Sequence, residues 1–469
     1  MVLAIGKVLQ VLIALVSIKI LTEVLSTKEV GNYYLLLAVL TFFNFTSLNP
    51  LGQYYGRHLI SWEGSKNLLN ATNVLIVLRV IAIVISLLVA YAVFEYFEYH
   101  KYYTLTEFLL FIFIALVSGT YLVLLSAVNT LGNRIKFIKY MVATLAVGLL
   151  LSLIIVFFIE KSGIAWLYGI VISQLLFIVP VYNFLVKDNR FSSSKIQSTV
   201  TKEYIKKVSY FLIPITITLF LQWGQNISYR FIIEAKYSIE ILAFIAVGLS
   251  VSGAIFSAVE GLATQYFNPI YLRQITNASK EERTIAWNEL AGYMLPVYIL
   301  LTVFVMSLAP YLMKILVAEK FHDAYIYVIF GASIEFFRVL TNMVYLVSQS
   351  ELKTHTTIVP YAIGFLISIM TLYFMDFSHN LWSIPIVLTM AYGIILVILF
   401  SNMKKLLPIQ INFASIGKAL LLSIPFGMVY FLDIHYPIMI TLSIVVGAGL
   451  YLLVGLYLLQ PREREENLI

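Results

Sequence analysis

Seven ionisable side chains lie inside apolar stretches that otherwise carry almost no charge. If these stretches span a membrane, each such side chain costs about 3 kcal/mol or more when it faces lipid, so it needs a partner, a wet cavity or a route to the surface. Buried cations can hold an anionic group, and buried carboxylates can take up a proton or a cation. The seven residues are Lys7, Lys19, Arg79, Arg230, Glu260, Glu335 and Arg338.

The basic members of this set differ in depth. Lys7 lies near the end of its stretch, where we expect the side chain to extend its ammonium to the surface. Lys19 and Arg230 lie about one helical turn from the ends of their apolar stretches. Two interpretations stay open: both side chains extend to the surface, or both hold an anionic headgroup. Arg79 and Arg338 are deeper and favour a functional role.

The two acidic members each allow two readings. Glu335 precedes Arg338 by three residues, which places both on one helix face and makes a local ion pair the alternative to a role in binding. Glu260 has no basic neighbour in sequence. It is either a protonatable site for H⁺ or Na⁺ coupling or the partner of an arginine on another helix.

Polar side chains gather in two of the apolar stretches. The stretch 33–56 contains Pro50, which removes a backbone donor, so the helix there is expected to bend and to line a cavity. The stretch 208–232 carries amides at i, i+3 and i+4 spacing, which indicates either hydrogen bonds between helices or, with Trp223 and Tyr54 nearby, a sugar site. The amides expected to line the cavity are Asn44, Asn49, Gln53, Gln222, Gln225 and Asn226.

The composition indicates a helical membrane protein. The 469 residues are 61% hydrophobic and 12% charged, with a mean hydropathy of +0.92. The apolar runs lack the alternation of a β-barrel. Cysteine is absent and no histidine pair has zinc-ligand spacing, so we expect no disulfide, metal site or catalytic residue. The net charge of +7 is spread over loops, which argues against a nucleic-acid partner.

The apolar runs predict an all-α polytopic fold of about fourteen transmembrane helices. The first run begins almost at Met1 without a basic leader and is expected to be a retained helix. Lysine and arginine concentrate in alternate loops, which predicts that both termini are cytoplasmic. The expected spans are 3–23, 33–56, 71–94, 106–130, 138–159, 163–186, 208–232, 240–268, 288–313, 323–349, 355–376, 380–401, 416–432 and 436–460.

A basic, serine-containing segment divides the spans into two sets of six plus two. The expected parts are an N-terminal lobe at 1–187, a cytoplasmic linker at 188–207, a C-terminal lobe at 208–402, and two extra helices with a cytoplasmic tail at 403–469. An offset of 211 positions places Lys19 on Arg230 and Glu23 on Glu234. This register predicts an internal repeat, as in two-lobed transporters.

Short motifs extend this pattern to a known family. They are Ser17-Ile-Lys19, the turn Leu25 to Tyr34, Asn49 to Arg57 and Thr130-Leu-Gly-Asn133. With them the sequence resembles the polysaccharide-repeat flippases, also called O-antigen or lipid-linked oligosaccharide flippases, of the multidrug/oligosaccharidyl-lipid/polysaccharide (MOP) exporter superfamily. The resemblance implies a V-shaped pair of six-helix lobes around a cationic cleft. It also implies alternating-access transport of an undecaprenyl-pyrophosphate-linked oligosaccharide across the bacterial cytoplasmic (inner) membrane.

Carried over by position, the cleft cations would be Lys19, Arg79, Arg230 and Arg338. The resemblance implies a lipid bilayer and a polyprenyl-pyrophosphate-linked glycan of O-antigen, capsule or exopolysaccharide synthesis as partners. A polysaccharide polymerase and glycosyltransferases are further possible partners, and no cofactor is implied beyond H⁺ or Na⁺ for coupling. No phosphate-binding loop for a nucleotide is present.

Three alternatives stay open. Fourteen helices rather than twelve resemble the lipid II flippases, whose last two helices help to form a groove for the lipid tail. A multidrug cation antiporter would need an acidic cavity, yet the stretch Leu219-Phe-Leu-Gln222 carries an amide where many such antiporters have a glutamate. A membrane polymerase would need a large loop and a carboxylate or histidine base within reach of the substrates. The loops between the expected spans on the outer side are short, which argues for a transporter and not an enzyme.

Overall fold

The computed structural model describes residues 2–187, 202–275, 278–351, 353–434 and 436–459. Within these ranges the chain is helical and has no strand. The helices of ten or more residues are α1 (Val2–Val24), α2 (Thr27–Phe43), α3 (Asn49–Gly64), α4 (Leu68–Tyr96), α5 (Leu105–Ser118), α6 (Thr120–Thr130), α7 (Arg134–Phe158), α8 (Gly163–Leu185), α9 (Lys202–Ile227), α11 (Ile239–Ile275), α12 (Lys280–Leu316), α13 (Tyr325–Ser350), α14 (Ile358–Phe374), α15 (Ser383–Leu406), α16 (Phe413–Ser423) and α17 (Ile438–Leu459). Shorter helices include η1 (Asn44–Leu48), α10 (Tyr229–Lys236) and η7 (Ile424–Phe431).

The helices account for the expected membrane spans. Twelve helical stretches in the described part of the chain are long and apolar enough to cross a membrane. The long helices α1 and α9 correspond to the two remaining expected spans. Large apolar side chains stand exposed along many of these helices, as lipid-facing surfaces require. The chain is therefore a multi-pass, all-α membrane protein, as the sequence predicts.

The chain forms two compact units. Unit 1 comprises Met1–Ile13 and Val24–Glu234, and unit 2 comprises Ala14–Glu23 and Ala235–Ile469. Helix α1 is thus divided between the units, and α9 belongs to unit 1, where it packs against α2, η1 and α3. The lobe boundaries expected from the sequence stay predictions. Residues 188–201 of the expected linker, and the tail from 460, lie outside the described residues.

The second expected span is one continuous helical stretch, Thr27–Gly64, whose α-helical pattern changes to a π-helix just before its proline. Pro50 has no N–H to give to the preceding turn, and the five residues before α3 form the π-helix η1. Two side chains add hydrogen bonds to carbonyls beside η1: Asn44 Nδ2 donates to the Leu40 carbonyl at 3.0 Å, and Thr46 Oγ1 donates to the Phe42 carbonyl at 2.7 Å. Because a π-helix has more residues per turn than an α-helix, η1 changes which side chains of α3 face the interior of unit 1.

Close helix packing in unit 1 depends on glycine. Gly169 of α8 lies so near α7 that a Cβ there would overlap the backbone of Ser152. The Ser152 hydroxyl also donates to the Trp166 carbonyl at 2.7 Å, which fixes the register of α7 on α8.

We expect Gly169→Ala to destabilise the protein by about 2 kcal/mol or more, because α7 and α8 must separate to admit a methyl group. Gly64→Ala is the matched control, since no atom lies within 4 Å of a Cβ at that position. Thermal unfolding in detergent, followed by size-exclusion chromatography, measures both. Equal stability of the two variants would contradict the packing described for α7 and α8.

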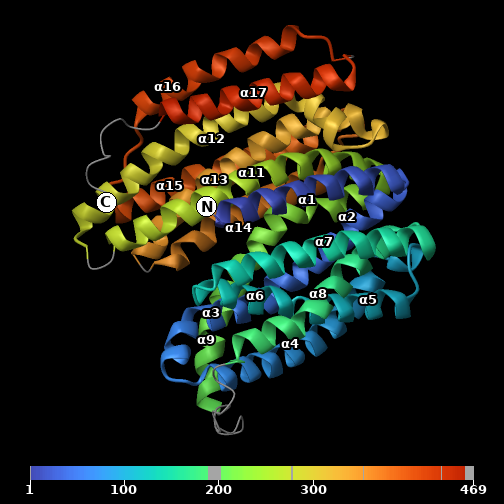
Figure 1. Ribbon diagram of the computed structural model, residues 1–469, viewed down its shortest axis with the longest axis vertical. Helices are drawn as coiled ribbons and strands as arrows, with labels where there is room; N and C mark the ends of the chain where they lie inside the picture. The colour runs from blue at the N-terminus through green and yellow to red at the C-terminus, as the bar shows by residue number, and fades with distance from the viewer. Residues whose placement is uncertain (1, 188–201, 276–277, 352, 435, 460–469) are drawn as a thin grey trace. The chain divides into compact units, whose positions relative to one another are not determined.

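In unit 2, the last two long helices pack on α12 (Figure 1). Gly455 of α17 admits the side chain of Leu300 from α12. Two lysines hydrogen-bond carbonyls near the ends of α17: Lys314 Nζ donates to the Tyr436 carbonyl at 2.6 Å, and Lys418 Nζ donates to the Leu458 carbonyl at 2.6 Å. These contacts join α16 and α17 to the rest of unit 2.

Candidate functional site

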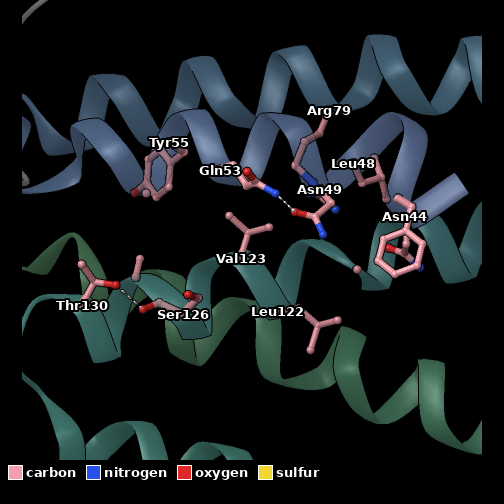
Figure 2. Close-up of a pocket in the computed structure, with 15 residues that line it drawn as sticks. Asn44, Leu48, Asn49, Gln53, Tyr55, Arg79, Leu122, Val123, Ser126 and Thr130 are labelled. Atoms are coloured by element: carbon pink, nitrogen blue, oxygen red, sulfur yellow. Dashed lines mark hydrogen bonds between the residues drawn. The ribbon is translucent and has the colours of Figure 1, made fainter. Parts of the chain in front are cut away.

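A pocket of about 430 Å³ lies within unit 1, between α3 and α6, with α4 behind it (Figure 2). Its volume falls in the range of small-ligand sites. The polar residues in its lining include three of the amides that the sequence singles out, together with one buried cation. The lining residues are Asn44, Phe45, Leu48, Asn49, Gly52, Gln53, Tyr55, Gly56, Arg79, Gly119, Leu122, Val123, Ser126, Ala127 and Thr130.

Arg79 is the only charged side chain that lines this pocket, and it is 1% exposed. Its Nε donates to Thr120 Oγ1 at 3.1 Å. The other two guanidinium nitrogens are buried and make no hydrogen bond within the described structure. None of the ion pairs among the described residues includes Arg79. A buried cation without a counter-charge is costly, and an anion in the pocket would offset that cost.

The guanidinium reaches the pocket because its neighbour is a glycine. A Cβ at Gly119 would lie 3.3 Å from Arg79 Nη2 and 3.4 Å from Asn44 Oδ1. The guanidinium and the Asn44 amide therefore meet at this end of the pocket. Farther along, the Tyr55 hydroxyl is 2.7 Å from Thr72 Oγ1, a hydrogen bond that ties α3 to α4 and holds the pocket wall.

The amides of α9 are not among the pocket-lining residues. Gln225 is 1% exposed, whereas Gln222 and Asn226 are half-buried. Beside them, Trp223 Nε1 donates to the Ala38 carbonyl of α2 at 3.1 Å. The structure thus places Asn44, Asn49 and Gln53 in one pocket with Arg79, and the three α9 amides lie elsewhere in unit 1. A substrate role for either group stays a prediction.

Arg230 is the second candidate cleft cation that lies in unit 1. Its Nη1 donates to the Tyr34 carbonyl at 2.9 Å, and its guanidinium carbon lies 5.2 Å from the centre of the Tyr34 ring. Its Nε is buried without a hydrogen bond within the described chain. No carboxylate pairs with it among the described residues. Aromatic rings and a carbonyl therefore stabilise Arg230, and its charge is not neutralised.

Lys19 lies in unit 2, although it is close to the N-terminus. Its Nζ donates to the Val317 carbonyl at the end of α12, at 2.6 Å, and pairs with Glu23 at 3.0 Å. Lys19 and its expected repeat counterpart Arg230 thus each bond a backbone carbonyl contributed by the other half of the sequence. The repeat itself stays a prediction.

Arg338 in unit 2 is held between two carboxylates. Its Nη2 lies 2.7 Å from Glu260 Oε2 and 2.7 Å from Glu335 Oε2. Asn342 Nδ2 donates to Glu260 Oε1 at 2.9 Å. The side chains of Arg338, Glu260 and Glu335 are between 17% and 21% exposed. The local ion pair and the inter-helix pair, both left open by the sequence, occur together. We call Glu260, Glu335 and Arg338 the charged triad.

The candidate cleft cations of the two units therefore differ in whether they have an acidic partner. Lys19 and Arg338 of unit 2 have acidic partners, whereas none of the ion pairs in the described ranges involves Arg79 or Arg230 of unit 1. Among the described residues no group of three or more acidic, histidine or cysteine side chains could hold a metal ion. Among the four cations that the sequence singles out for the cleft, Arg79 is thus the one that lines this pocket and takes part in no ion pair within the described ranges.

Several residues of this site have no signal in the sequence that points to their role. Thr120, which holds Arg79, and Gly119, which admits it, lie in an apolar helix with no local signal. Thr130 occurs in the Thr130-Leu-Gly-Asn133 motif, so a signal existed for it, but not for its place in the pocket. Asn342, which donates a hydrogen bond to Glu260 of the charged triad, likewise has no such signal.

A scan of protein-family models and a search of curated proteins gave no match. Solved structures gave matches over most of the chain. The lipid II flippase MurJ in an inward closed conformation aligns with a TM-score of 0.70 and 12% identity over 96% of both chains. An outward-facing multidrug resistance MATE family transporter of the MOP superfamily aligns with a TM-score of 0.61 and 13% identity, over 86% of this chain and 94% of the transporter.

A MATE protein in a straight conformation aligns with a TM-score of 0.59 and 12% identity, over 86% of this chain and 94% of that protein. Identities this low establish the fold alone. The chain accordingly has the same fold as these transporters.

Proposed function

We propose that this protein is a flippase that moves an undecaprenyl-pyrophosphate-linked oligosaccharide across the bacterial cytoplasmic membrane by alternating access. The observation that carries the proposal is the unneutralised, buried guanidinium of Arg79 in a pocket lined by amides. A diphosphate cannot cross hydrocarbon unaided, and a buried arginine offers it charge-assisted hydrogen bonds. Arg230 would be a second cation for the same headgroup, with Lys19 and Arg338 as the further candidates.

A lipid II flippase is an equally supported form of the same proposal. The likeness to MurJ extends over nearly all of both chains. Both substrates carry a polyprenyl diphosphate, so the Arg79 pocket suits either. A multidrug antiporter is disfavoured, because a cationic drug would meet the positive charge of Arg79. In either flippase form we expect both termini on the cytoplasmic side, and a polymerase and glycosyltransferases as neighbours in the pathway.

Reconstitution in liposomes tests the substrate class. Purified protein is supplied in parallel with undecaprenyl diphosphate carrying a tetrasaccharide, with lipid II, and with a fluorescent cationic drug. We expect one of the two lipids to cross, measured by its accessibility to an added glycosidase or antibody, and the drug to stay outside. Transport of the drug without either lipid would overturn the proposal.

The charged triad is the proposed coupling site. If Glu260 and Glu335 are both ionised, Arg338 neutralises only one of them, so a proton or Na⁺ would complete the charge balance in an apolar setting. Glu335→Gln leaves a neutral Glu260–Arg338 pair that no longer requires the extra cation. We therefore expect this variant to lose any acceleration of transport by a pH or Na⁺ gradient.

The control for this prediction is Glu281→Gln, which removes an exposed carboxylate at the start of α12. Transport by the control should respond to the gradients as the wild-type protein does. If Glu335→Gln also responds fully to both gradients, the charged triad is not the coupling site.

A further inference from the structure

The pocket is a groove that runs from Arg79 along α3 and α6. Asn44 and Arg79 meet at Gly119, and a Cβ at Gly52 would lie 3.1 Å from Val123, so the two helices follow the groove in the same direction. From Gly119 to Thr130 the helix rises about 16 Å at 1.5 Å per residue. The charge is at one end only, because every other lining residue is neutral.

Beyond Arg79, the two walls of the groove differ. Figure 2 shows Asn49 and Gln53 on one side, across from Leu122 and Val123. Gln53 Nε2 donates to Asn49 Oδ1 at 3.2 Å, which leaves the Gln53 Oε1 acceptor and the Asn49 Nδ2 donors for a ligand. One wall thus offers hydrogen bonds and the other offers an apolar surface. A pyranose ring has the matching groups, since its hydroxyls donate and accept and its C–H faces are apolar.

We propose that the groove binds a glycosyl phosphate as one ligand, with the phosphate at Arg79 and the sugars that follow it along α3 and α6 towards Gly56 and Thr130. This inference rests on the proposed function and adds to it a glycan-binding subsite built within unit 1 alone. An isolated inorganic anion would use only the end of the groove at Arg79. The neutral amides and glycines beyond Arg79 would then have no ligand to contact.

Gly56 provides a direct probe of this groove. Gly56 lines the groove, yet no atom lies within 4 Å of a Cβ placed there, so a larger side chain would fill the groove without displacing the protein. Gly64 lies on the same helix with equally open surroundings and does not line the groove. Gly56→Leu and Gly64→Leu therefore form a matched pair.

The experiment compares two lipids in proteoliposomes: undecaprenyl diphosphate carrying one N-acetylglucosamine, and the same lipid carrying a tetrasaccharide that begins with that sugar. We expect Gly56→Leu to lower tetrasaccharide transport about ten-fold more than monosaccharide transport, the scale of losing one or two hydrogen bonds. Gly64→Leu should leave the ratio of the two rates at the wild-type value. Should Gly56→Leu fail to reach the membrane, Gln53→Ala is measured in its place with the same expectation.

The outcomes separate the inference from the proposed function. An unchanged ratio in Gly56→Leu, whether both rates persist or both fall equally, would overturn the glycan subsite while Arg79→Gln still impairs both lipids. Normal transport of both lipids by Arg79→Gln, or of neither by the wild-type protein, would overturn the proposed function itself.

Discussion

Replacing Arg79 with glutamine is expected to lower transport of the lipid-linked glycan about 100-fold, the scale of losing two charge-assisted hydrogen bonds to a diphosphate. The reason is the position of its guanidinium, which is buried, bonded through Nε to Thr120 and otherwise without a hydrogen-bond partner in the described structure. Those two nitrogens are the ones that would bind the headgroup. Arg79→Lys keeps the positive charge but cannot donate two parallel hydrogen bonds to the diphosphate. Its transport rate should therefore fall between the rates of the wild-type protein and Arg79→Gln.

The same substitution should not destabilise the fold. Arg79 bonds one neutral hydroxyl, and none of the ion pairs in the described ranges involves it, so glutamine removes a desolvated charge and leaves no carboxylate unpaired. We expect unfolding of the variant in detergent at the wild-type temperature or above it. Loss of transport without loss of stability would show that Arg79 is retained for its ligand.

The control is Arg134→Gln, which makes the same change at an exposed position at the start of α7. Its transport rate and its stability should both match the wild-type values. Arg79→Gln contradicts the account if its transport equals that of Arg134→Gln at equal amounts of protein in the membrane.

Replacing Arg338 with methionine should have the opposite pattern, with a loss of stability of about 3 kcal/mol. Its guanidinium lies 2.7 Å from both Glu260 and Glu335, and these carboxylates are only 21% and 17% exposed. Without Arg338, two carboxylates repel each other in a partly desolvated setting. We expect less folded protein in the membrane and a lower unfolding temperature in detergent.

A compensating variant tests the cause. Adding Glu260→Gln and Glu335→Gln to Arg338→Met removes all three charges of the charged triad and should restore most of the stability. If the triple variant is as unstable as Arg338→Met alone, packing rather than charge explains the loss. Arg79 and the half-buried Arg338 are thus expected to differ: Arg338 stabilises the fold by pairing with two carboxylates, whereas Arg79 stabilises a bound anion.

Much of the fold could be predicted from the sequence, because the length of an apolar run reports the thickness of the membrane. Each expected span has a helix, and the π-helix η1 lies just before Pro50 in the span where the sequence predicts a bend. The bend itself stays a prediction. The membership of α1 and α9 in the two units could not be predicted. It depends on contacts between residues far apart in sequence, such as Lys19 with Val317 and Arg230 with Tyr34.

The site was predictable in its residue types and not in its pairings. Scarce charges in apolar runs drew attention to Arg79 and Arg338 alike. The local spacing could suggest Glu335 as a partner of Arg338, but the contact with Glu260 depends on how α11 packs on α13. Arg79 differs because its near neighbours are Thr120 and Gly119, and an apolar helix gives no signal for either role.

Binding of undecaprenyl diphosphate, the lipid without its glycan, tests the central claim most directly. Native mass spectrometry or microscale thermophoresis of the detergent-purified protein gives a Kd for the wild-type chain, Arg79→Gln and Arg134→Gln. We expect similar Kd values for the wild-type protein and Arg134→Gln, and a Kd at least about ten-fold higher for Arg79→Gln. Equal affinity of all three proteins would contradict the claim that the buried guanidinium of Arg79 holds the anionic headgroup.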